Sequence, residues 1–352
     1  MTKNMKKDFN IESLVRDNVA RMKPYSSARD EFKAVGEGMI FLDANENPFD
    51  NGVNRYPDPQ QRTLKSVLAR QKGVQPNQLL IGNGSDEVLD LLFRAFCEPG
   101  RDNIIFQPPT YGMYKVLAET NAVAYKEVLL DEEFQPQMAE LKNTIDDCTK
   151  MVFFCSPNNP SGNTFDADKI EVILQDFSGL VVIDEAYIDF SEENSWINRL
   201  DEFPNLVITQ TLSKAYGMAG IRIGLSYASA EIISILNKIK PPYNVNQLSQ
   251  QRALERVENV EEVAYEVALL KAQREELYEA FTEIDFIEKM HESDANFILV
   301  KVDDALKRYN QLLEQGIVAR NRSNQPRCEN TLRFTVGTKE ENKQLIKVLQ
   351  KL

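Results

Sequence analysis

The amino-acid sequence predicts an α/β protein with a large domain, built on a mainly parallel sheet flanked by helices, and a smaller α+β domain. Short apolar runs alternate with helical segments from about residue 78 to 240, which is typical of parallel strands covered on both faces. After Pro241 and Pro242 this alternation stops, and a long polar helix is expected instead. The length of 352 residues also exceeds what one hydrophobic core commonly supports, so we expect two domains.

The elements of the large domain follow from the periodicity of apolar residues. Strands are expected at 78–82, 103–106, 151–155, 180–184 and 206–209. Helices are expected between several of them, at 85–96, 111–121, 166–177 and 230–239. The first of these helices has apolar residues at helical spacing and begins with Ser85 and Asp86, which are suited to capping its N-terminus.

The carboxyl-terminal part has a different, mixed order of elements. A helix over about 246–282 would lead into strands at 297–300 and 331–336 and helices at 303–315 and 338–351. Residues 1–44 are too few to fold alone, so we expect them to pack on the small domain or on a partner subunit. The predicted divisions are 1–44 for this N-terminal segment, 45–245 for the large domain, and 246–352 for the linking helix and small domain.

Composition excludes several classes of protein. Hydrophobic residues make up 42% and charged residues 27% of the chain, as in ordinary soluble proteins. The net charge of −13 argues against a nucleic-acid partner, because phosphate backbones bind a surplus of Lys and Arg. No apolar stretch approaches the ~20 residues that cross a bilayer, and the N-terminus lacks the apolar run of a secretory signal. With four cysteines at unpaired spacings, we expect a cytoplasmic protein with reduced thiols.

His291 is the only histidine in the chain. A metal site built from several histidines is therefore excluded, and no metal is expected. A Ser-His-Asp triad would depend on His291 alone, which lies in a polar, loop-like stretch where a surface role is expected. If the protein is an enzyme, its base is then a lysine, a carboxylate or a tyrosine.

The most informative stretch runs from Thr211 to Arg222 and reads Thr-Leu-Ser-Lys-Ala-Tyr-Gly-Met-Ala-Gly-Ile-Arg. It follows a predicted strand, so Lys214 is expected just beyond a strand end, where α/β proteins bind ligands. There a lysine can form a Schiff base with an aldehyde, while hydroxyl groups and Arg222 hold a phosphate. Together these features describe an anchor for pyridoxal 5'-phosphate (PLP), a ring that carries an aldehyde and a phosphate. The alternative is a solvated lysine in a Gly-rich loop.

A second group of candidates lies at the ends of two other predicted strands. Asp184 could keep the PLP pyridine nitrogen protonated, which lets the ring accept electrons from a substrate. Tyr187 and Asn159 could donate hydrogen bonds to the phenolate oxygen and so favour its ionised form. The alternatives are a capping role for Asp184 and ordinary turn chemistry for Asn159. A Walker B acid is excluded because the chain has no Gly-x-x-x-x-Gly-Lys-Ser/Thr loop.

Two further motifs follow predicted strands. Gly82-Asn-Gly-Ser-Asp-Glu opens a helix, so its backbone N–H groups and the positive end of the helix dipole could bind a phosphate. A Gly-x-Gly sequence alone is a weak signal, but Thr211, Ser213 and Arg222 could close on the same phosphate. Tyr111, in Pro-Thr-Tyr-Gly-Met-Tyr, could stack on the pyridine ring or serve as a core aromatic.

Taken in order, these motifs resemble a known family. The series is Asn45-Glu-Asn-Pro, Arg55-Tyr-Pro-Asp-Pro, Gly82-Asn-Gly-Ser-Asp-Glu, Pro109-Thr-Tyr-Gly-Met-Tyr, Ser156-Pro-Asn-Asn-Pro-Ser-Gly, Asp184-Glu-Ala-Tyr and Thr211-Leu-Ser-Lys-Ala-Tyr-Gly. It is similar to the histidinol-phosphate aminotransferases, which belong to the fold-type I, class II PLP-dependent aminotransferases. The likeness runs from about residue 20 to the carboxyl end.

The resemblance implies a PLP-dependent transferase of fold type I and a role for each matching position. Lys214 would be the Schiff-base lysine, Asp184 the partner of the pyridinium, and Tyr187 a phenolate donor together with Asn159. The other cofactor positions that it implies are Gly84, Ser85, Asp86, Tyr111, Thr211, Ser213 and Arg222. The substrate positions that it implies are Tyr25, Asn45, Tyr56, Arg320 and Arg333. Both arginines would face the anionic group of the substrate, and Tyr56 would come from the neighbouring subunit of a homodimer.

The implied reaction transfers an amino group between L-histidinol phosphate and 2-oxoglutarate, in histidine biosynthesis. Threonine-phosphate decarboxylases and aromatic-amino-acid aminotransferases share most of these motifs, so both remain alternatives. A regulator that borrows the fold is disfavoured, because the chain has no spare segment for a basic DNA-binding module. The sequence leaves open which residues would recognise the imidazole ring.

Overall fold

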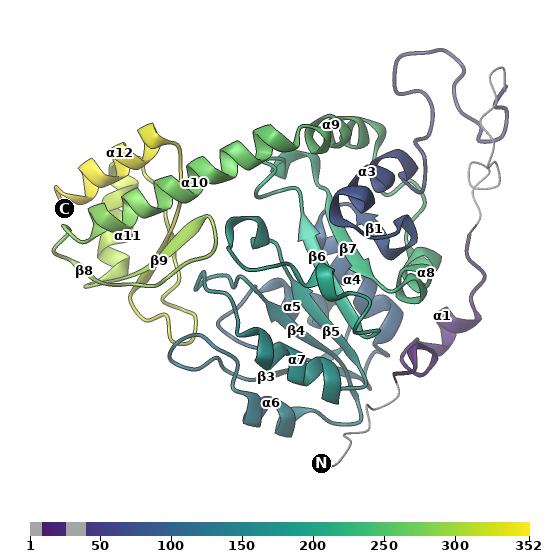
Figure 1. Ribbon diagram of the computed structural model, residues 1–352, viewed down its shortest axis with the longest axis horizontal. Helices are drawn as coiled ribbons and strands as arrows, with labels where there is room; N and C mark the ends of the chain where they lie inside the picture. The colour runs from purple at the N-terminus through teal and green to yellow at the C-terminus, as the bar shows by residue number, and fades with distance from the viewer. Residues whose placement is uncertain (1–8, 26–39) are drawn as a thin grey trace.

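The computed structural model describes residues 9–25 and 40–352, and these residues form two β-sheets. Figure 1 shows the larger sheet among its helices, the smaller sheet at the other end of the molecule, and helix α10 running between the two regions. This is an α/β architecture with a smaller α+β region towards the carboxyl end, so the predicted fold class is confirmed.

The larger sheet has the strand order β1-β7-β6-β5-β4-β2-β3. Its strands are β1 (Leu79–Gly82), β2 (Asn103–Phe106), β3 (Ala124–Glu127), β4 (Thr149–Cys155), β5 (Leu180–Asp184), β6 (Leu206–Thr211) and β7 (Gly224–Ala228). Strand β7 pairs antiparallel with β1 and β6, and all other neighbours are parallel. Every residue of β5, β6 and β7 is buried, and for β5 and β6 this burial explains the apolar runs Leu180–Ile183 and Leu206–Ile208 in the sequence.

Two layers of helices enclose this sheet. One face packs against α4 (Ser85–Phe96), α5 (Met113–Thr120) and α8 (Ala230–Ile239). The other face packs against α3 (Arg62–Lys72), α6 (Met138–Thr144), α7 (Ala167–Asp176) and α9 (Gln247–Glu258). Side chains of β5 alternate between the two layers: Val181 and Ile183 join the second core, whereas Leu180 and Val182 join the first. The helices cover the faces of the sheet and leave the ends of its strands for a ligand.

The predicted single helix over 246–282 is wrong in one respect, because the structure has two helices, α9 and α10 (Val260–Phe281), that meet at Asn259. Asn259 has φ −92° and ψ 60°, outside the helical range, so α9 ends there. Across this break the Arg256 guanidinium forms ion pairs with Glu262 and Glu266, which hold the two helices at the bend. Among residues 9–25 and 40–352 no helix, α10 included, is long and apolar enough to cross a membrane.

The smaller sheet is antiparallel throughout and has the strand order β10-β11-β9-β8. Its elements are β8 (Ile287–Met290), β9 (Phe297–Val302), β10 (Arg320–Asn321), β11 (Thr331–Thr335), α11 (Ala305–Glu314) and α12 (Lys339–Leu349). The carboxyl-terminal part of α10 packs with them around a separate hydrophobic core. The structure confirms the two strands predicted here, as β9 and β11, and the two predicted helices, as α11 and α12. Strands β8 and β10 were not predicted.

The described residues of the N-terminal segment lie against helices of the larger sheet. Ile11 is buried in the core that α4 and α8 share, and Arg16 bonds to Glu98 at 3.2 Å. Helix α1 (Asp17–Arg21) contacts α8. For residues 9–25 the predicted packing on the small domain is therefore wrong, because their apolar side chains are buried elsewhere. Packing on a partner subunit and the three domain boundaries stay predictions.

Candidate active site

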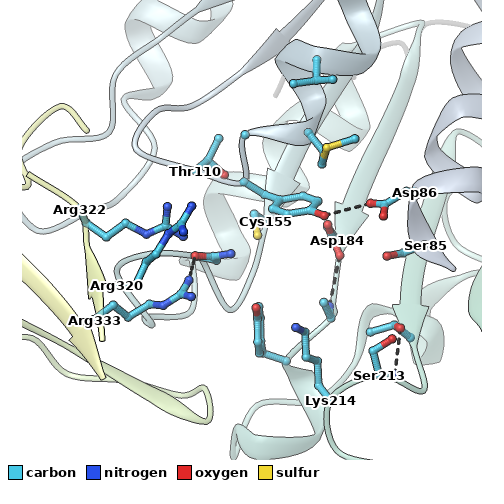
Figure 2. A pocket seen from close by; sticks show the side chains of 18 of the residues that line it. Ser85, Asp86, Thr110, Cys155, Asp184, Ser213, Lys214, Arg320, Arg322 and Arg333 are labelled. Carbon is cyan, nitrogen blue, oxygen red and sulfur yellow. Dashed lines mark hydrogen bonds between the residues drawn. The ribbon is translucent and has the colours of Figure 1, made fainter. Parts of the chain in front are cut away.

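A cavity of about 570 Å³ lies where the carboxyl ends of β4, β5 and β6 meet the N-terminus of α4 and the smaller sheet's β10 and β11. Figure 2 shows side chains from both regions pointing into it. Of the residues selected from the sequence, it is lined by Ser85, Asp86, Tyr111, Asn159, Asp184, Tyr187, Thr211, Ser213, Lys214, Arg222, Arg320 and Arg333. The parallel strands therefore bring together residues that are far apart in the sequence, as expected for their carboxyl ends.

Lys214 lies in the turn after β6, and its side chain points into the cavity. A bond of 2.9 Å from the Gly217 N–H to the Lys214 carbonyl closes this turn, and Gly217 has φ +67°, a conformation that favours glycine. Partial burial and the positive charges of Arg333 and Arg222 lower the pKa of Lys214. The carboxylate of Asp184 acts in the opposite direction. A lowered pKa increases the fraction of neutral amine, which is the form that acts as a nucleophile or base.

Asp184 is the last residue of β5 and is only 4% exposed. Its Oδ2 accepts a hydrogen bond from the Tyr114 hydroxyl at 2.8 Å, and its Oδ1 accepts one from the Ala186 N–H at 3.2 Å. Burial raises the pKa of Asp184, while the bond from Tyr114 lowers it. No cation of the described residues forms an ion pair with this carboxylate. Because a buried carboxylate costs free energy without a cationic partner, Asp184 is suited to a protonated ring nitrogen of a ligand.

Tyr114 is a functional candidate that ends the Pro109-Thr-Tyr-Gly-Met-Tyr motif but was given no role from the sequence. It lies on α5, is fully buried, and its ring is 5.7 Å from that of Tyr111 and 4.9 Å from that of Phe153, measured between centroids. The sequence offers only an aromatic residue three positions after Tyr111. A hydroxyl donor and an ordinary core aromatic look the same at that spacing, and only the contact with Asp184 distinguishes them.

The N-terminus of α4 and the turn around Lys214 form a corner that suits an anion. Gly84 precedes α4 with φ +85°, and a Cβ atom at this position would lie 2.6 Å from Nη2 of Arg222. Ser85 and Ser213 bring hydroxyl groups to the same corner. Unpaired N–H groups of a first helical turn, hydroxyl groups and a guanidinium form a typical phosphate-binding set. Gly84 itself does not line the cavity, but its missing side chain lets Arg222 approach.

Two predicted cofactor residues, Thr211 and Asp86, use their side chains in contacts with other protein groups. The Thr211 Oγ1 donates to the Ile223 carbonyl at 3.2 Å and accepts a backbone N–H two residues further on at 3.1 Å. Its hydroxyl proton is therefore directed at the backbone, and Thr211 shapes the turn beside the anion corner. Asp86 accepts from the Tyr111 hydroxyl at 2.9 Å and forms an ion pair with Arg222 at 3.4 Å. These contacts fix the ring of Tyr111 at the wall of the cavity.

Asn159 and Tyr187 each contact a residue of the smaller sheet. The Oδ1 of Asn159 accepts a hydrogen bond from Arg333, which leaves the amide nitrogen as the donor for a ligand. The Tyr187 ring centroid is 5.6 Å from the Lys214 Nζ, and the ring packs edge-on against Phe297. Burial raises the pKa of Tyr187, so its hydroxyl is protonated at neutral pH and able to donate.

Some lining residues were missed, and some predicted residues lie elsewhere. Arg322 joins Arg320 and Arg333 in the cavity, and other lining residues that were given no role from the sequence include Thr110, Cys155 and Gln325. Tyr25 is 72% exposed, whereas Asn45 and Tyr56 line a separate hollow on the surface, where Tyr56 stacks on Tyr243 at 4.5 Å. Within one chain these three predicted substrate residues do not reach the cavity, so their roles stay predictions.

The lining residues fit PLP. The corner beside Gly84 offers donors to a phosphate, and the buried carboxylate of Asp184 needs a cation such as a protonated pyridine nitrogen. Lys214 would then meet the aldehyde, and Asn159 and Tyr187 would meet the phenolate oxygen. The arginines of the smaller sheet lie at the opposite side of Lys214 and remain for a substrate (Figure 2).

The chain is similar to known proteins over nearly its whole length. Residues 42–349 match the family described as aminotransferase class I and II. The chain is 62% identical over 346 residues to the histidinol-phosphate aminotransferase of Christiangramia forsetii, covering 98% of this chain and 99% of that protein. It is also 62% identical over 345 residues to that of Flavobacterium johnsoniae, with the same coverage of 98% and 99%. A solved structure, the histidinol-phosphate aminotransferase from Clostridium acetobutylicum, matches with a TM-score of 0.79 at 24% identity, covering 85% of this chain and 90% of that one, a likeness of fold.

Proposed function

Because the chain belongs to the class I and II aminotransferases, we propose that it transfers an amino group between L-histidinol phosphate and 2-oxoglutarate in histidine biosynthesis. The products are imidazole-acetol phosphate and glutamate, and the cofactor is PLP in a transferase of fold type I. The observation that carries this proposal is one cavity that combines a lysine of lowered pKa with an anion corner and a group of arginines. The likeness to histidinol-phosphate aminotransferases over 98% of the chain supports the choice of substrate.

Lys214 is the group that moves the proton. When bound, PLP supplies an aldehyde that condenses with amines and a ring that draws electrons from the α-carbon of the substrate. With PLP in place, the neutral Nζ of Lys214 would take the proton from the substrate α-carbon and later return it. Burial and the charges of Arg333 and Arg222 favour this neutral form by lowering the pKa of Lys214.

Asp184, Asn159 and Tyr187 keep the cofactor in its reactive state. The ionised Asp184 stabilises a proton on the pyridine nitrogen, and the Tyr114 hydroxyl stabilises the ionised Asp184. Donation from Asn159 and Tyr187 favours the ionised phenolate oxygen. In this proposal Asp184, Asn159 and Tyr187 keep their protonation states, and Lys214 is the residue that takes up and returns the proton.

Arg333 and Arg320 hold the anionic group of either substrate. The paired N–H groups of a guanidinium match the spacing of oxygens in both carboxylate and phosphate. One pocket can therefore accept a phosphorylated amine and a 2-oxo acid in turn. Arg333 also donates to Asn159, which connects the substrate end of the cavity to the cofactor end.

The proposal includes a homodimer in which Tyr56 reaches the cavity of the partner. Large apolar side chains are exposed on one stretch of the chain and on α9: Ile40, Leu42, Phe49, Val53, Tyr56 and Leu248. Such an exposed apolar surface is typical of a subunit interface. The test is to mix inactive Lys214→Ala with inactive Tyr56→Ala, because a mixed dimer then regains one intact site. No recovery of activity in a proven mixed dimer would place Tyr56 at its own chain's site or outside both.

A cytoplasmic location is part of the same proposal. All four cysteines are free, and Cys97, Cys155 and Cys328 are buried. Thiols that stay unpaired are typical of reducing compartments. Recovery of the native protein in an exported fraction of the cell would contradict this location.

The reaction is tested by incubating purified protein with histidinol phosphate, 2-oxoglutarate and PLP. We expect stoichiometric glutamate and no carbon dioxide. Carbon dioxide from threonine phosphate would favour a decarboxylase, and faster turnover of aromatic amino acids would favour an aromatic aminotransferase. Borohydride reduction of the holoprotein, followed by peptide mapping, should place the cofactor on Lys214, and labelling of another lysine would contradict the assignment.

A further inference from the structure

Arg320, Arg322 and Arg333 place three guanidinium groups at one end of the cavity, here called the arginine cluster (Figure 2). Arg320 and Arg333 are Cα partners in the antiparallel pair of β10 and β11. Arg322 follows Arg320 by two positions, so it lies on the same face of the strand. Its backbone N–H bonds to the Thr331 carbonyl at 2.9 Å, which continues the pairing past the end of β10. The backbone therefore fixes Arg322 beside the other two arginines.

The arginine cluster is unfavourable without a bound anion. Like charges directly opposite each other on neighbouring strands destabilise a sheet. No carboxylate of the described residues forms an ion pair with any member of the cluster, and the Nε atoms of Arg322 and Arg333 are buried without a hydrogen-bond partner there. Burial, with the charges of Arg333 and Arg320, lowers the pKa of Arg322 to about 10, so Arg322 remains charged at neutral pH. A bound anion would offset these unfavourable terms.

The three arginines differ in what else they contact. Arg333 donates to Asn159 and lies 4.9 Å from the ring centroid of Phe297, so its position is tied to the cofactor end of the cavity. Arg320 is exposed at the rim. Arg322 is half-buried, and its side chain makes no hydrogen bond or ion pair to the described part of the chain. Its guanidinium is therefore without a protein partner among the described residues, unlike that of Arg333, and is less exposed than that of Arg320.

We propose that Arg322 determines substrate specificity, as the guanidinium that makes the arginine cluster prefer a phosphate monoester to a carboxylate. The inference rests on the proposed function, in which a phosphorylated amine and a 2-oxo acid enter the same cavity. A carboxylate has one charge and two oxygens, which two guanidinium groups can satisfy. A phosphate monoester carries about −1.5 to −2 charges and three terminal oxygens at neutral pH. Only the phosphate therefore needs the third guanidinium.

The kinetic test compares Arg322→Gln with Arg322→Lys and with the control Arg327→Gln. Arg327 is exposed on the same loop and does not line the cavity. We expect Arg322→Gln to raise the KM for histidinol phosphate about 30- to 100-fold, with kcat changed by less than about twofold. The KM for 2-oxoglutarate should change by less than about threefold. Arg322→Lys retains the charge and should recover most of the loss, whereas Arg327→Gln should match the wild type in both constants.

A binding experiment separates this inference from the proposed function. Wild-type holoenzyme is titrated in a calorimeter with inorganic phosphate and, separately, with acetate. We expect phosphate to bind more tightly, and Arg322→Gln to weaken phosphate about tenfold or more while acetate changes little. If the wild type does not turn over histidinol phosphate, the proposed function fails, yet the phosphate titration still tests Arg322.

Three results would overturn the role of Arg322. The first is equal binding of phosphate and acetate by the wild type, and the second is an unchanged phosphate affinity in Arg322→Gln. The third is an equal loss for both anions, which would indicate a general loss of positive charge. Thermal midpoints and the absorbance of bound PLP show whether each variant is folded, and Arg322→Met replaces Arg322→Gln if the latter does not fold.

Discussion

Replacing Tyr114 with phenylalanine removes one hydroxyl group from the surroundings of Asp184. That hydroxyl donates to the Asp184 Oδ2 at 2.8 Å in a fully buried position. Phenylalanine keeps the ring, so the contacts with Tyr111 and Phe153 remain. The substitution therefore deletes a single hydrogen bond to a buried carboxylate and leaves the packing of the core in place.

The size of the effect follows from the charge of the acceptor. A hydrogen bond to a charged group contributes about 1.5–3 kcal/mol. Its loss should raise the pKa of Asp184 further than burial already does, so less of the carboxylate is ionised to hold a protonated pyridine nitrogen. If the whole contribution is lost from cofactor binding, the Kd for PLP rises about 10- to 100-fold. The rise should be larger at lower pH than at higher pH, because more of the carboxyl group is protonated at the lower pH.

The assay is a titration of the apoprotein with PLP, followed by absorbance and fluorescence over a range of pH. Tyr227→Phe is the matched control, because Tyr227 is also fully buried and its hydroxyl has no hydrogen-bond partner among the described residues. Its removal should leave both the Kd for PLP and the thermal midpoint at least as favourable as in the wild type. An unchanged Kd in Tyr114→Phe, or an equal loss in both variants, would refute the reasoning.

Three further predictions concern the cavity. Lys214→Ala should lower kcat by more than about 1,000-fold with an unchanged circular dichroism spectrum, and full activity would exclude Lys214 as the base. Asp184→Asn should weaken PLP binding yet raise the thermal midpoint of the apoprotein at neutral pH. The reason is that folding buries the Asp184 carboxylate, whose pKa is raised. The gain in thermal midpoint should vanish as the pH falls below about 4, because this carboxyl group is then protonated in both the folded and the unfolded chain. Thermal melts of both proteins from neutral pH to below about pH 4 test this. Arg333→Lys should raise the KM of both substrates in steady-state assays, and a rise for only one would show that the two anions bind at different places.

Much of the candidate site could be predicted because its signals are local. Asp184 and Lys214 both follow runs of buried apolar residues, and the end of such a strand is where α/β proteins place ligand-binding groups. Tyr114 and Arg322 carried no such signal. Tyr114 depends on a contact with Asp184 across 70 positions of sequence, and Arg322 on its backbone bond to Thr331. Both depend on tertiary pairing, which the local pattern does not contain.

The same reason explains which elements of the fold were missed. Strand β3 lies at the edge of the larger sheet and none of its four residues is buried, so the sequence shows no apolar run there. Strand β7 is fully buried, but it begins with glycine and contains serine and tyrosine, and its antiparallel direction breaks the expected alternation. The bend at Asn259 has no proline or glycine to mark it. It is stabilised by ion pairs between Arg256 of α9 and two glutamates of α10, a contact that the local sequence does not show.

The arrangement of charges also explains why the cavity retains an unfavourable group of arginines. Arg333 lowers the pKa of Lys214, and it is joined through Asn159 to the end of the cavity where Asp184 lies. In the proposed reaction the lowered pKa keeps the free amine neutral, and a substrate anion bound to Arg333 would offset part of the positive charge, so the neutral amine would accept a proton more strongly. The same contact would fix the distance from the anion to the substrate's α-carbon and so place that carbon beside the Nζ. Under this proposal, binding of the anionic group would both position the substrate and strengthen the base that acts on it, and we expect a substrate without an anion to lose both effects.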